Sequence, residues 1–375
     1  MARRVVILTN CLPHYRIPLY EALMPLVDHL QVFLSTRMER DRNWEVFWGK
    51  LNVEVQRSLS WTRRFRNVHG YRDSSEIHIP YDTFSRLRRY KPDAIISCEF
   101  GLRTVMSVLY RMAFPKTVLI VWATLSEHTE ATRGRLRAML RCWIVRRVDA
   151  AFVNGKSGAR YLAGLGFTGP VFTTPYVIDN AAFLGESTVE KDDTLRLLYC
   201  GQLIERKGLY PFLSILRQWC VNHPNCSIVL RAAGDGPERN KLESVLLPPN
   251  LKMELLGNFA PDRLPSCYHA ASIFVFPTLG DEWGTVVNEA LTAGLPVLGS
   301  IYSQAVEELI CEGKNGWVFD PCDRQNTYSA LSRALTANRE TLGILSLHAR
   351  ARIAEVTPDI VAATMAGAIQ TLCGE

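Results

Sequence analysis

Residues 281–297 read DEWGTVVNEALTAGLPV, and this stretch decides the fold. An apolar strand is expected immediately before it, at residues 273–276, and a second strand at residues 296–298. Between the two strands we expect a helix that begins near Gly284 or Thr285. A strand, a helix and another strand in this order predict a unit of parallel sheet.

The same alternation of short strands and helices continues along the whole chain, as is typical of a parallel α/β architecture. In the first half we expect strands at residues 5–9, 31–35, 94–97, 118–122 and 151–153. In the second half we expect them at residues 195–200, 227–232, 252–256, 273–276 and 296–298. Ligands of such sheets bind beyond the carboxyl ends of the strands, so the loops that follow the strands are the candidate sites.

The chain has 375 residues, which is more than one hydrophobic core organises, so two domains are expected. Residues 175–193 carry few strand or helix signals and form the predicted linker. We therefore place an N-terminal domain at residues 1–178 and a C-terminal domain at residues 179–375. As an alternative to this boundary, the last helix would cross back and pack on the N-terminal domain.

Composition excludes several classes of protein. The ten cysteines include no C-x-x-C pair and no zinc-finger spacing, which favours reduced thiols in a cytoplasmic protein. The apolar run after Arg4 has four residues, fewer than a secretory signal needs, and no window has the ~18 apolar residues of a membrane span. Neither half has G-x-G-x-x-G after its first strand, so no nicotinamide or flavin cofactor is expected.

The two halves differ in charge. Residues 1–180 hold 27 Lys and Arg against 15 Asp and Glu, whereas the remainder is net negative. No nucleic-acid-binding motif accompanies the basic residues, so an anionic membrane surface or a phosphorylated acceptor is the better partner. A helix at residues 135–146 carries four of the arginines, on a face that is either solvated or in contact with a membrane. We expect its apolar residues to form one buried stripe, which comprises Leu136, Met139, Leu140, Trp143 and Ile144.

Four loops of the second half follow expected strands and carry candidate binding residues. Residues 201–208 contain Lys207, a point charge suited to phosphate, after a glycine that lets backbone approach a ligand. Residues 234–238 and 257–259 could likewise contact a ligand, or they could be ordinary turns, because they contain typical turn residues. In the fourth loop, the backbone N–H groups at residues 284–286 would face a diphosphate, and acidic side chains such as Glu289 suit sugar hydroxyls. An acidic helix cap at residues 281–282 is the structural alternative.

Together these loops resemble the donor domain of the large retaining glycosyltransferase family that has the GT-B fold. The family pattern reads G-R-L-x-x-x-K-G, G-x-G-P, E-x7-E and A-x-G-x-P-V, and it corresponds to residues 201–208, 234–237, 281–289 and 293–297. The resemblance covers about residues 195–335. It implies two Rossmann-like parallel-sheet domains that face each other across a cleft. The opening loop at residues 13–21 also resembles the corresponding loop of bacterial members that build polysaccharides.

The resemblance implies roles for individual residues. Asp281, His128 and Lys207 would be catalytic, with Asp281 on the transferred sugar and Lys207 on the diphosphate. Donor binding would involve Gly201, Gln202, Lys207, Asn258, Phe259, Gly284, Thr285, Val286 and Glu289. Acceptor binding would involve Glu99, Tyr15 and Arg16. No metal ligand is expected, because Lys207 and the helix amides would stabilise the leaving group.

Two positions depart from the family pattern. Gln202 stands where the family has a phosphate-binding arginine, and Arg206 is the residue that could replace that charge. Asp281 stands where the first glutamate belongs, and the neighbouring Glu282 could take over its role. Whether Asp281 or Glu282 meets the sugar therefore stays open.

The sequence thus predicts a retaining glycosyltransferase. It would move a sugar from a nucleoside-diphosphate sugar to a lipid-linked or oligosaccharide acceptor in cell-surface polysaccharide biosynthesis, without nucleic acid as a partner. The protein would be cytoplasmic, with its basic N-terminal domain against the inner face of the membrane. The alternatives are a non-catalytic scaffold that binds sugar nucleotides and a sugar-nucleotide epimerase on the same fold.

Overall fold

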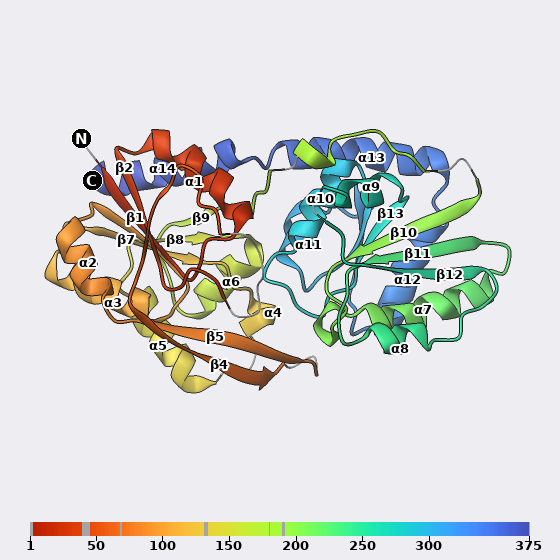
Figure 1. Cartoon of the computed structure of the whole chain (residues 1–375), viewed down its shortest axis with the longest axis horizontal. Helices are drawn as coiled ribbons and strands as arrows, with labels where there is room; N and C mark the ends of the chain where they lie inside the picture. The colour runs from red at the N-terminus through yellow and green to blue at the C-terminus, as the bar shows by residue number, and fades with distance from the viewer. Residues whose placement is uncertain are drawn as a thin grey trace. The chain divides into compact units, whose positions relative to one another are not determined.

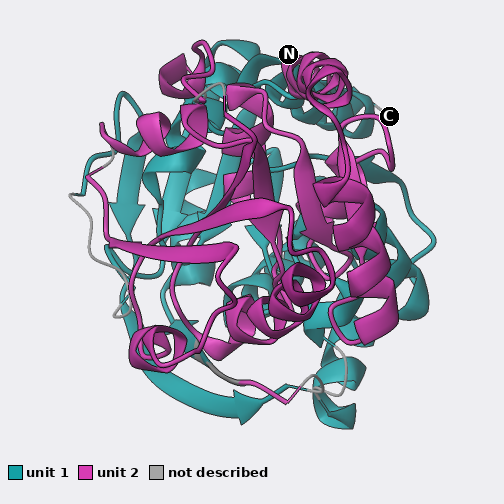
Figure 2. Ribbon diagram, turned by 90° about the vertical axis from the view of Figure 1, so that its right-hand side faces the viewer, with its two compact units in different colours: residues 1–68, 73–179, 356–375 teal, residues 69–72, 180–355 magenta. Residues whose placement is uncertain are grey.

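A computed structural model describes residues 3–39, 46–67, 70–130, 134–179, 181–189, 192–260 and 262–374. The chain forms two compact units, which Figure 2 colours separately. Unit 1 comprises residues 1–68, 73–179 and 356–375, and unit 2 comprises residues 69–72 and 180–355. Residues 180, 190 and 191 of the predicted linker lie outside the described residues.

Unit 1 is built on a seven-stranded parallel sheet with the order β3-β2-β1-β6-β7-β8-β9 (Figure 1). Its strands are β1 (Arg4–Thr9), β2 (His29–Leu34), β3 (Asn52–Val55), β6 (Ala94–Cys98), β7 (Val118–Ala123), β8 (Ala150–Val153) and β9 (Val171–Thr173). The central strands β6, β7 and β8 are buried along their whole length, as parallel strands covered on both faces must be. The strand order reverses between β1 and β6, and this is the topological switch point of unit 1.

Helices cover this sheet. They are α1 (Ile17–Leu23), α2 (Thr83–Tyr90), α3 (Leu102–Ala113), α4 (Glu127–Glu130), α5 (Arg135–Val145), α6 (Lys156–Gly164) and α14 (Pro358–Gly374), with 3-10 turns η1 (His14–Arg16) and η2 (Met24–Leu26). The C-terminal helix α14 packs against α1, far from it in sequence. The helical stretch Arg339–Gly374 is long and apolar enough to cross a membrane by length and composition, which is weak evidence because core helices pass the same test.

A separate two-stranded ribbon of β4 (Ser58–Arg66) and β5 (Arg72–Pro80) belongs to the basic part of unit 1. Figure 1 shows it as a long ribbon outside the seven-stranded sheet. The apolar side chains of Leu59 and Trp61 on β4 are 64% and 48% exposed, beside the exposed Arg63 and Arg64. The ribbon therefore presents a surface that is both apolar and basic.

The prediction of a buried apolar stripe on the helix at residues 135–146 is wrong. In α5 the side chains of Leu136, Met139 and Leu140 are 84%, 67% and 43% exposed, and only the end of the stripe, at Ile144, is buried. The face that packs inward instead carries Arg141, whose guanidinium donates to the carboxylate of Glu130 at 2.6 Å. A buried ion pair thus rotates the helix so that its apolar residues point outward.

Unit 2 contains a six-stranded parallel sheet with the order β12-β11-β10-β13-β14-β15. The strands are β10 (Thr194–Cys200), β11 (Ser227–Ala233), β12 (Leu251–Gly257), β13 (Ile273–Phe276), β14 (Val297–Ser300) and β15 (Gly316–Phe319). Its switch point lies between β10 and β13, where Leu197 is in register with Ile273. The core on one face includes Leu197, Trp219 and Leu331, all fully buried.

The helices and turns of unit 2 connect these strands. They are η3 (Ala181–Phe183), η4 (Glu205–Lys207), α7 (Leu209–Asn222), α8 (Arg239–Glu243), α9 (Leu264–His269), α10 (Thr285–Ala293), α11 (Gln304–Leu309), α12 (Arg324–Leu335) and α13 (Arg339–Ala354). Two of them, η4 and α10, begin in loops that leave the switch point, so they determine the geometry of those loops.

Candidate functional site

The switch point of unit 2 brings together two of the expected catalytic side chains. Lys207 lies in the loop after β10 and Asp281 in the loop after β13, and the lysine ammonium donates a hydrogen bond to Asp281 Oδ2. Lys207 Nζ also lies 5.3 Å from the centre of the Phe276 ring, a cation–π contact. The two residues are 74 positions apart in sequence, and the fold alone places them in contact.

Arg206 belongs to the same cluster. Its guanidinium donates to the Gly280 carbonyl at 3.0 Å and lies 3.6 Å from Asp281 Oδ2. The side chain therefore points toward Asp281, which the sequence could not establish. Asp281 lies between two cations, so the three charged side chains of this cluster together carry one net positive charge.

Burial opposes ionisation of both Lys207 and Asp281. Burial raises the pKa of Asp281, but the charges of Lys207 and Arg206 and the hydrogen bonds from Lys207 and the Trp283 backbone outweigh it, so the pKa of this carboxyl is lowered. Burial also lowers the pKa of Lys207, and Arg206 adds to that shift while Asp281 opposes it. The pair is an ionised carboxylate beside a lysine ammonium, because Asp281 accepts a hydrogen bond from Lys207 and forms an ion pair with Arg206.

The loop that carries Asp281 is fixed from behind by the segment around α11. Gln304 donates its side-chain amide to the Glu282 carbonyl at 2.6 Å, and the hydroxyl of Ser303 donates to the Trp283 carbonyl. The buried Trp283 indole in turn donates to the side-chain oxygen of Asn288 at 2.8 Å. Glu282 itself is exposed, so only Asp281 of the two acidic residues points into the cluster.

The N-terminus of α10 has no side-chain cap. Gly284 is its N-cap residue with φ of 104°, a conformation that only glycine adopts readily, and a Cβ there would lie 2.6 Å from the Phe276 ring. The first-turn amides of Thr285 and Val286 thus begin the helix next to the Asp281 loop without a competing carboxylate or hydroxyl cap. Such a helix start is suited to a phosphate group.

Glu289 lies one turn further along α10. Its carboxylate oxygen Oε2 accepts a hydrogen bond of 2.6 Å from the hydroxyl of Tyr268 on α9. Burial raises the pKa of Glu289, although the bond from Tyr268 favours the ionised form. The contact of Tyr268 with Glu289 was not predicted from the sequence, because no shared motif or spacing links α9 to α10.

Glycines of the first two loops allow these loops to approach each other closely. The prediction that the glycine at the end of β10, Gly201, lets the backbone approach a ligand stays a prediction. A Cβ at Gly234 would lie 2.0 Å from the Gly201 carbonyl oxygen, and one at Gly236 would lie 2.4 Å from that of Leu203. At Gly208, with φ of 69°, a Cβ would lie 2.1 Å from the Pro277 carbonyl oxygen. Because these glycines have no Cβ, the loops of the site can pack closely against one another.

The remaining predicted donor residues lie around this cluster. Gln202 is exposed, and its backbone carbonyl accepts from the hydroxyl of Tyr199 at 2.7 Å. Asn258 is exposed and Phe259 half-buried at the end of β12, where Gly257 accepts from the backbone N–H of Gly234 at 2.8 Å. Their loop therefore adjoins the loop after β11.

The predicted residues of unit 1 lie at or near the carboxyl ends of its strands. Glu99 follows β6 with φ of 64°, unusual for a non-glycine residue, and its Oε1 accepts from the backbone N–H of Thr124 at 2.9 Å. Arg16 is buried with its guanidinium 3.7 Å from the centre of the Tyr176 ring, and Tyr15 lies 5.9 Å from the same ring. His128 lies on α4, with Nε2 3.8 Å from a carboxylate oxygen of its neighbour Glu127.

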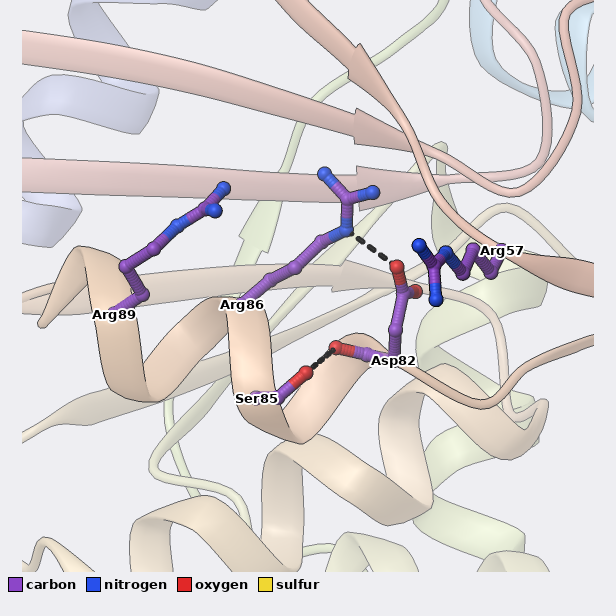
Figure 3. Close-up of a pocket in the computed structure, with 5 residues that line it drawn as sticks. All are labelled: Arg57, Asp82, Ser85, Arg86 and Arg89. Carbon is purple, nitrogen blue, oxygen red and sulfur yellow. Dashed lines mark hydrogen bonds and ion pairs between the residues drawn. The ribbon is translucent and has the colours of Figure 1, made fainter.

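Unit 1 also has a hollow of about 330 Å³ beside α2, shown in Figure 3. In that view Arg86 points at Asp82 and donates to it at 2.7 Å, whereas Arg57 and Arg89 lie on either side. Arg89 and Arg86 also reach the carboxylate of Glu54, and Arg89 is 72% exposed. The carboxylates of Asp82 and Glu54 thus offset most of the positive charge of the arginines around the hollow. The hollow is a surface feature.

Comparison with known proteins is consistent with the geometry of unit 2. The family described as Glycosyl transferases group 1 matches residues 194–337, which include both switch-point loops. Residues 194–337 form a glycosyl transferases group 1 domain. Sulfoquinovosyl transferase SQD2 of Arabidopsis thaliana is 30% identical over 150 residues, 39% of this chain and 28% of that protein. The chain spans 28% to 41% of the length of the first curated relatives it matches.

Solved structures extend the likeness from the group 1 domain to the whole chain. Sucrose-phosphate synthase from Thermosynechococcus elongatus superposes with a TM-score of 0.70 at 18% identity, covering 99% of each chain. HepE of Anabaena, solved with UDP, has a TM-score of 0.70 at 15% identity and covers 98% of this chain and 100% of its own. The chain therefore has the GT-B fold that the sequence predicted, with two units that each contain a parallel sheet. Every predicted donor residue lies in the group 1 domain.

Proposed function

We propose that this protein is a retaining glycosyltransferase that moves a sugar from a nucleoside-diphosphate sugar to a lipid-linked or oligosaccharide acceptor in cell-surface polysaccharide biosynthesis. The observation that carries the proposal is the contact between Lys207 and Asp281 at the switch point of the group 1 domain. It lies where open parallel sheets bind their ligands, beside a helix start suited to phosphate.

The proposed donor geometry follows from these contacts. The diphosphate lies at the amides of Thr285 and Val286 and takes a hydrogen bond from Lys207. Asp281 holds the lysine ammonium in place and meets hydroxyls of the transferred sugar. Glu289 accepts from the ribose hydroxyls, and Tyr268 orients its carboxylate. The residues after β12, Asn258 and Phe259, lie along the base.

The chemistry asked of this site is stabilisation of a departing diphosphate. Transfer on the face that the nucleotide leaves proceeds through an oxocarbenium-like transition state and needs no strong base. A fixed cation and fixed helix amides stabilise the negative charge as it develops. We therefore propose that turnover does not depend on a metal ion. EDTA should leave the rate unchanged, and a complete loss of activity that Mg²⁺ or Mn²⁺ restores would contradict this mechanism.

A nucleotide panel tests donor binding directly. The structure of HepE with UDP supports a uridine nucleotide as the first probe. Thermal unfolding should be measured with UDP, GDP, dTDP and ADP sugars, because a ligand that binds the folded state raises its melting temperature. At least one should raise it in the wild type and not in Glu289→Ala, while the exposed-lysine variant Lys314→Ala keeps the response. Absence of a response to every nucleotide would overturn the proposal.

The choice between Asp281 and Glu282 is also testable. Asp281→Ala removes the carboxylate that fixes Lys207, and we expect kcat to fall about 100-fold, the usual order for loss of one preorganised electrostatic partner. Glu282→Ala removes an exposed side chain and should change kcat less than twofold. Initial rates of donor hydrolysis or transfer decide between them. The reverse ranking would assign the sugar contact to Glu282.

The acceptor is proposed to bind unit 1. Glu99, Tyr15 and Arg16 lie at or near the carboxyl edge of its sheet, and the carboxylate of Glu99 is suited to an acceptor hydroxyl. His128 is proposed to approach the donor sugar. For this unit the support is the position of the residues at that edge and in the α4 region.

We further propose that unit 1 lies against the anionic inner face of the membrane. The exposed Leu136 and Met139 of α5 and the exposed Trp61 of the β4–β5 ribbon stand among arginines, a combination suited to a membrane interface. Each arginine near such a surface contributes about 1 kcal/mol. The protein should sediment with vesicles that contain phosphatidylglycerol and not with neutral phosphatidylcholine vesicles. Binding that ignores lipid charge would contradict the proposal.

A double variant isolates the apolar part of this surface. Leu136→Ser with Met139→Ser should reduce vesicle sedimentation while the melting temperature stays within about 2 °C, because exposed side chains add little to stability. The matched control is Ile144→Ser at the buried end of the same helix, which should lower the melting temperature. Unchanged sedimentation of the double variant would exclude α5 as a membrane contact.

A further inference from the structure

The switch point of unit 1 contains a buried arginine that forms no ion pair with a carboxylate among the described residues. Arg103, in the first turn of α3, is 4% exposed and donates to the side-chain oxygen of Asn10, which follows β1. This contact crosses the switch point between β1 and β6, as the contact of Lys207 with Asp281 crosses that of unit 2. The partner here is a neutral amide, so the charge of Arg103 is not balanced by that bond.

Most of the donor capacity of Arg103 is unused. Within the described part of the chain, its Nε and Nη1 atoms are buried and have no hydrogen-bond partner. An unpaired buried guanidinium is costly, and buried charges in proteins are ordinarily paired or hydrogen-bonded. The side chain is therefore built to meet a group that supplies acceptors.

Other buried donors lie close to Arg103. Arg16 is 7% exposed, and its Nη1 atom likewise has no partner among the described residues. The Arg16 guanidinium lies 4.2 Å from the centre of the Trp122 ring, and Trp122 is in register with Cys98 at the end of β6. Both guanidinium groups also act electrostatically on the Cys98 thiol. Both ring nitrogens of the buried His78 are also without a hydrogen bond in the described residues, and Arg103 acts on that ring.

The backbone supports the same conclusion. Gly101 is the N-cap of α3, a 12-residue helix, and gives it no side-chain cap. Amides at such a helix start attract negative charge. Two acidic residues nearby act electrostatically on Arg103 but form no ion pair with it among the described residues: Glu99, whose Oε1 accepts from the backbone N–H of Thr124, and Glu39, which lies 4.0 Å from His78 Nε2. No ion pair between Arg103 or Arg16 and a carboxylate occurs in the residues described.

We propose that Arg103, with Arg16, binds an oxyanion carried by the acceptor, a phosphate or a carboxylate, at the switch point of unit 1. The planar guanidinium of Arg103 has the fork geometry that matches such groups with two parallel hydrogen bonds. Glu99 Oε2, which has no hydrogen-bond partner within the described residues, is left to accept from a hydroxyl of the same molecule. The assignment of the anion to the acceptor rests on the proposed function, whereas the anion site itself does not.

The test measures anion binding with the donor site filled. Saturating UDP is added first, so that phosphate cannot report on the Lys207 site. Inorganic phosphate, glucuronate and glucose are then compared by thermal unfolding. At about ten times its Kd an anion should raise the melting temperature by about 3 °C, and neutral glucose should not. A response to phosphate alone would indicate that the acceptor carries a phosphate. A response to glucuronate would indicate that the acceptor class includes uronic acids.

Three variants complete the experiment. Arg103→Met should lose the anion response, and without anion it should melt at the same or a higher temperature than the wild type, because an unpaired buried charge is gone. Arg103→Lys should keep a weaker response, and the exposed-arginine control Arg57→Gln should keep a full one. A melting temperature of Arg103→Met below that of the wild type would indicate a structural role and overturn the proposal.

The two proposals can fail separately. If UDP stabilises the wild type and Arg103→Met equally but no anion does, the donor function stands and the anion site is overturned. If anions act through Arg103 while no nucleotide binds, the anion site stands and the glycosyltransferase proposal fails. An anion response that survives in Arg103→Met would place binding elsewhere and overturn the assignment.

Discussion

The two switch points of this protein have the same topology but differ in how their charged side chains are paired. In unit 2 a lysine and an aspartate meet across the switch point, with Arg206 beside them. In unit 1 an arginine meets an asparagine across it, and its other donors stay unpaired within the described residues. A parallel sheet thus fixes where a ligand site lies, while the paired or unpaired state of its charges indicates what the site binds.

The difference has a physical meaning. In unit 2 the carboxylate of Asp281 holds the lysine ammonium in one orientation, which suits a group that must meet developing charge at a defined point. In unit 1 the arginine donates to a neutral partner, and its Nε and Nη1 atoms have no hydrogen-bond partner in the described residues. The first arrangement is suited to the catalytic role proposed for unit 2, and the second is suited to the anion binding proposed for unit 1.

The largest expected effect is a difference in stability between variants of the two switch points. Loss of the cation should lower the free energy of unfolding at the switch point of unit 2 but not at that of unit 1. Lys207→Met leaves Asp281 buried beside Arg206 alone, so the free energy of unfolding should fall by about 3 kcal/mol, the order found when one member of a buried pair is removed. Turnover should fall 100- to 1000-fold, at about 2.7–4 kcal/mol of lost transition-state stabilisation. Urea unfolding and initial rates measure the two effects.

The control for this prediction is Arg103→Met, which removes a cation that has no acidic partner and should not lower the free energy of unfolding. Equal destabilisation by the two variants would break the comparison, because it would show that Arg103 is as fully paired as Lys207.

The second prediction concerns the close packing of the loops in unit 2. Gly208→Ala adds a methyl group 2.1 Å from the Pro277 carbonyl oxygen and should reduce the free energy of unfolding by about 3 kcal/mol or more. Gly313 has nearly the same φ, 72° against 69°, but nothing lies within 4 Å of its Cβ position. Gly313→Ala should therefore cost only the backbone strain, about 1 kcal/mol. Denaturant midpoints compare them, and equal losses would show that conformation alone requires Gly208.

The sequence predicted the sheets well, because buried parallel strands are runs of apolar residues. All ten expected strands exist, and each of their ends lies within two residues of the prediction. The strands missed were short or polar: β3, β9 and β15 have three or four residues, β4 carries arginines at positions that are exposed, and β5 begins with the polar run RDSSE. On α5 the apolar spacing was read correctly but its direction was not, because the buried bond from Arg141 to Glu130 outweighs the pattern.

The candidate site divides in the same way. Lys207, Asp281 and Glu289 were predicted because they belong to motifs in register along the chain. Tyr268 and Arg103 were not, since each acts through a contact between elements that no spacing connects. Pairing across a switch point depends on the sheet order, which a single sequence does not specify for side chains outside a shared motif.

The smallest effect concerns the residue that the sequence missed in unit 2. Tyr268→Phe removes the hydroxyl that favours the ionised form of Glu289, so the already raised pKa of this carboxyl should rise further. In the proposed function Glu289 binds the ribose as a carboxylate, so its protonation as the pH falls should weaken donor binding. The acid limb of kcat/KM for the donor should therefore move to higher pH in Tyr268→Phe, with a loss of a few-fold at pH 7, about 1 kcal/mol for one hydrogen bond. In Glu289→Gln, which cannot ionise, the limb due to this group should vanish. A pH profile that is the same in all three proteins would show that Glu289 is a structural partner of Tyr268 and leave Lys207 and Asp281 as the functional charges of the switch point.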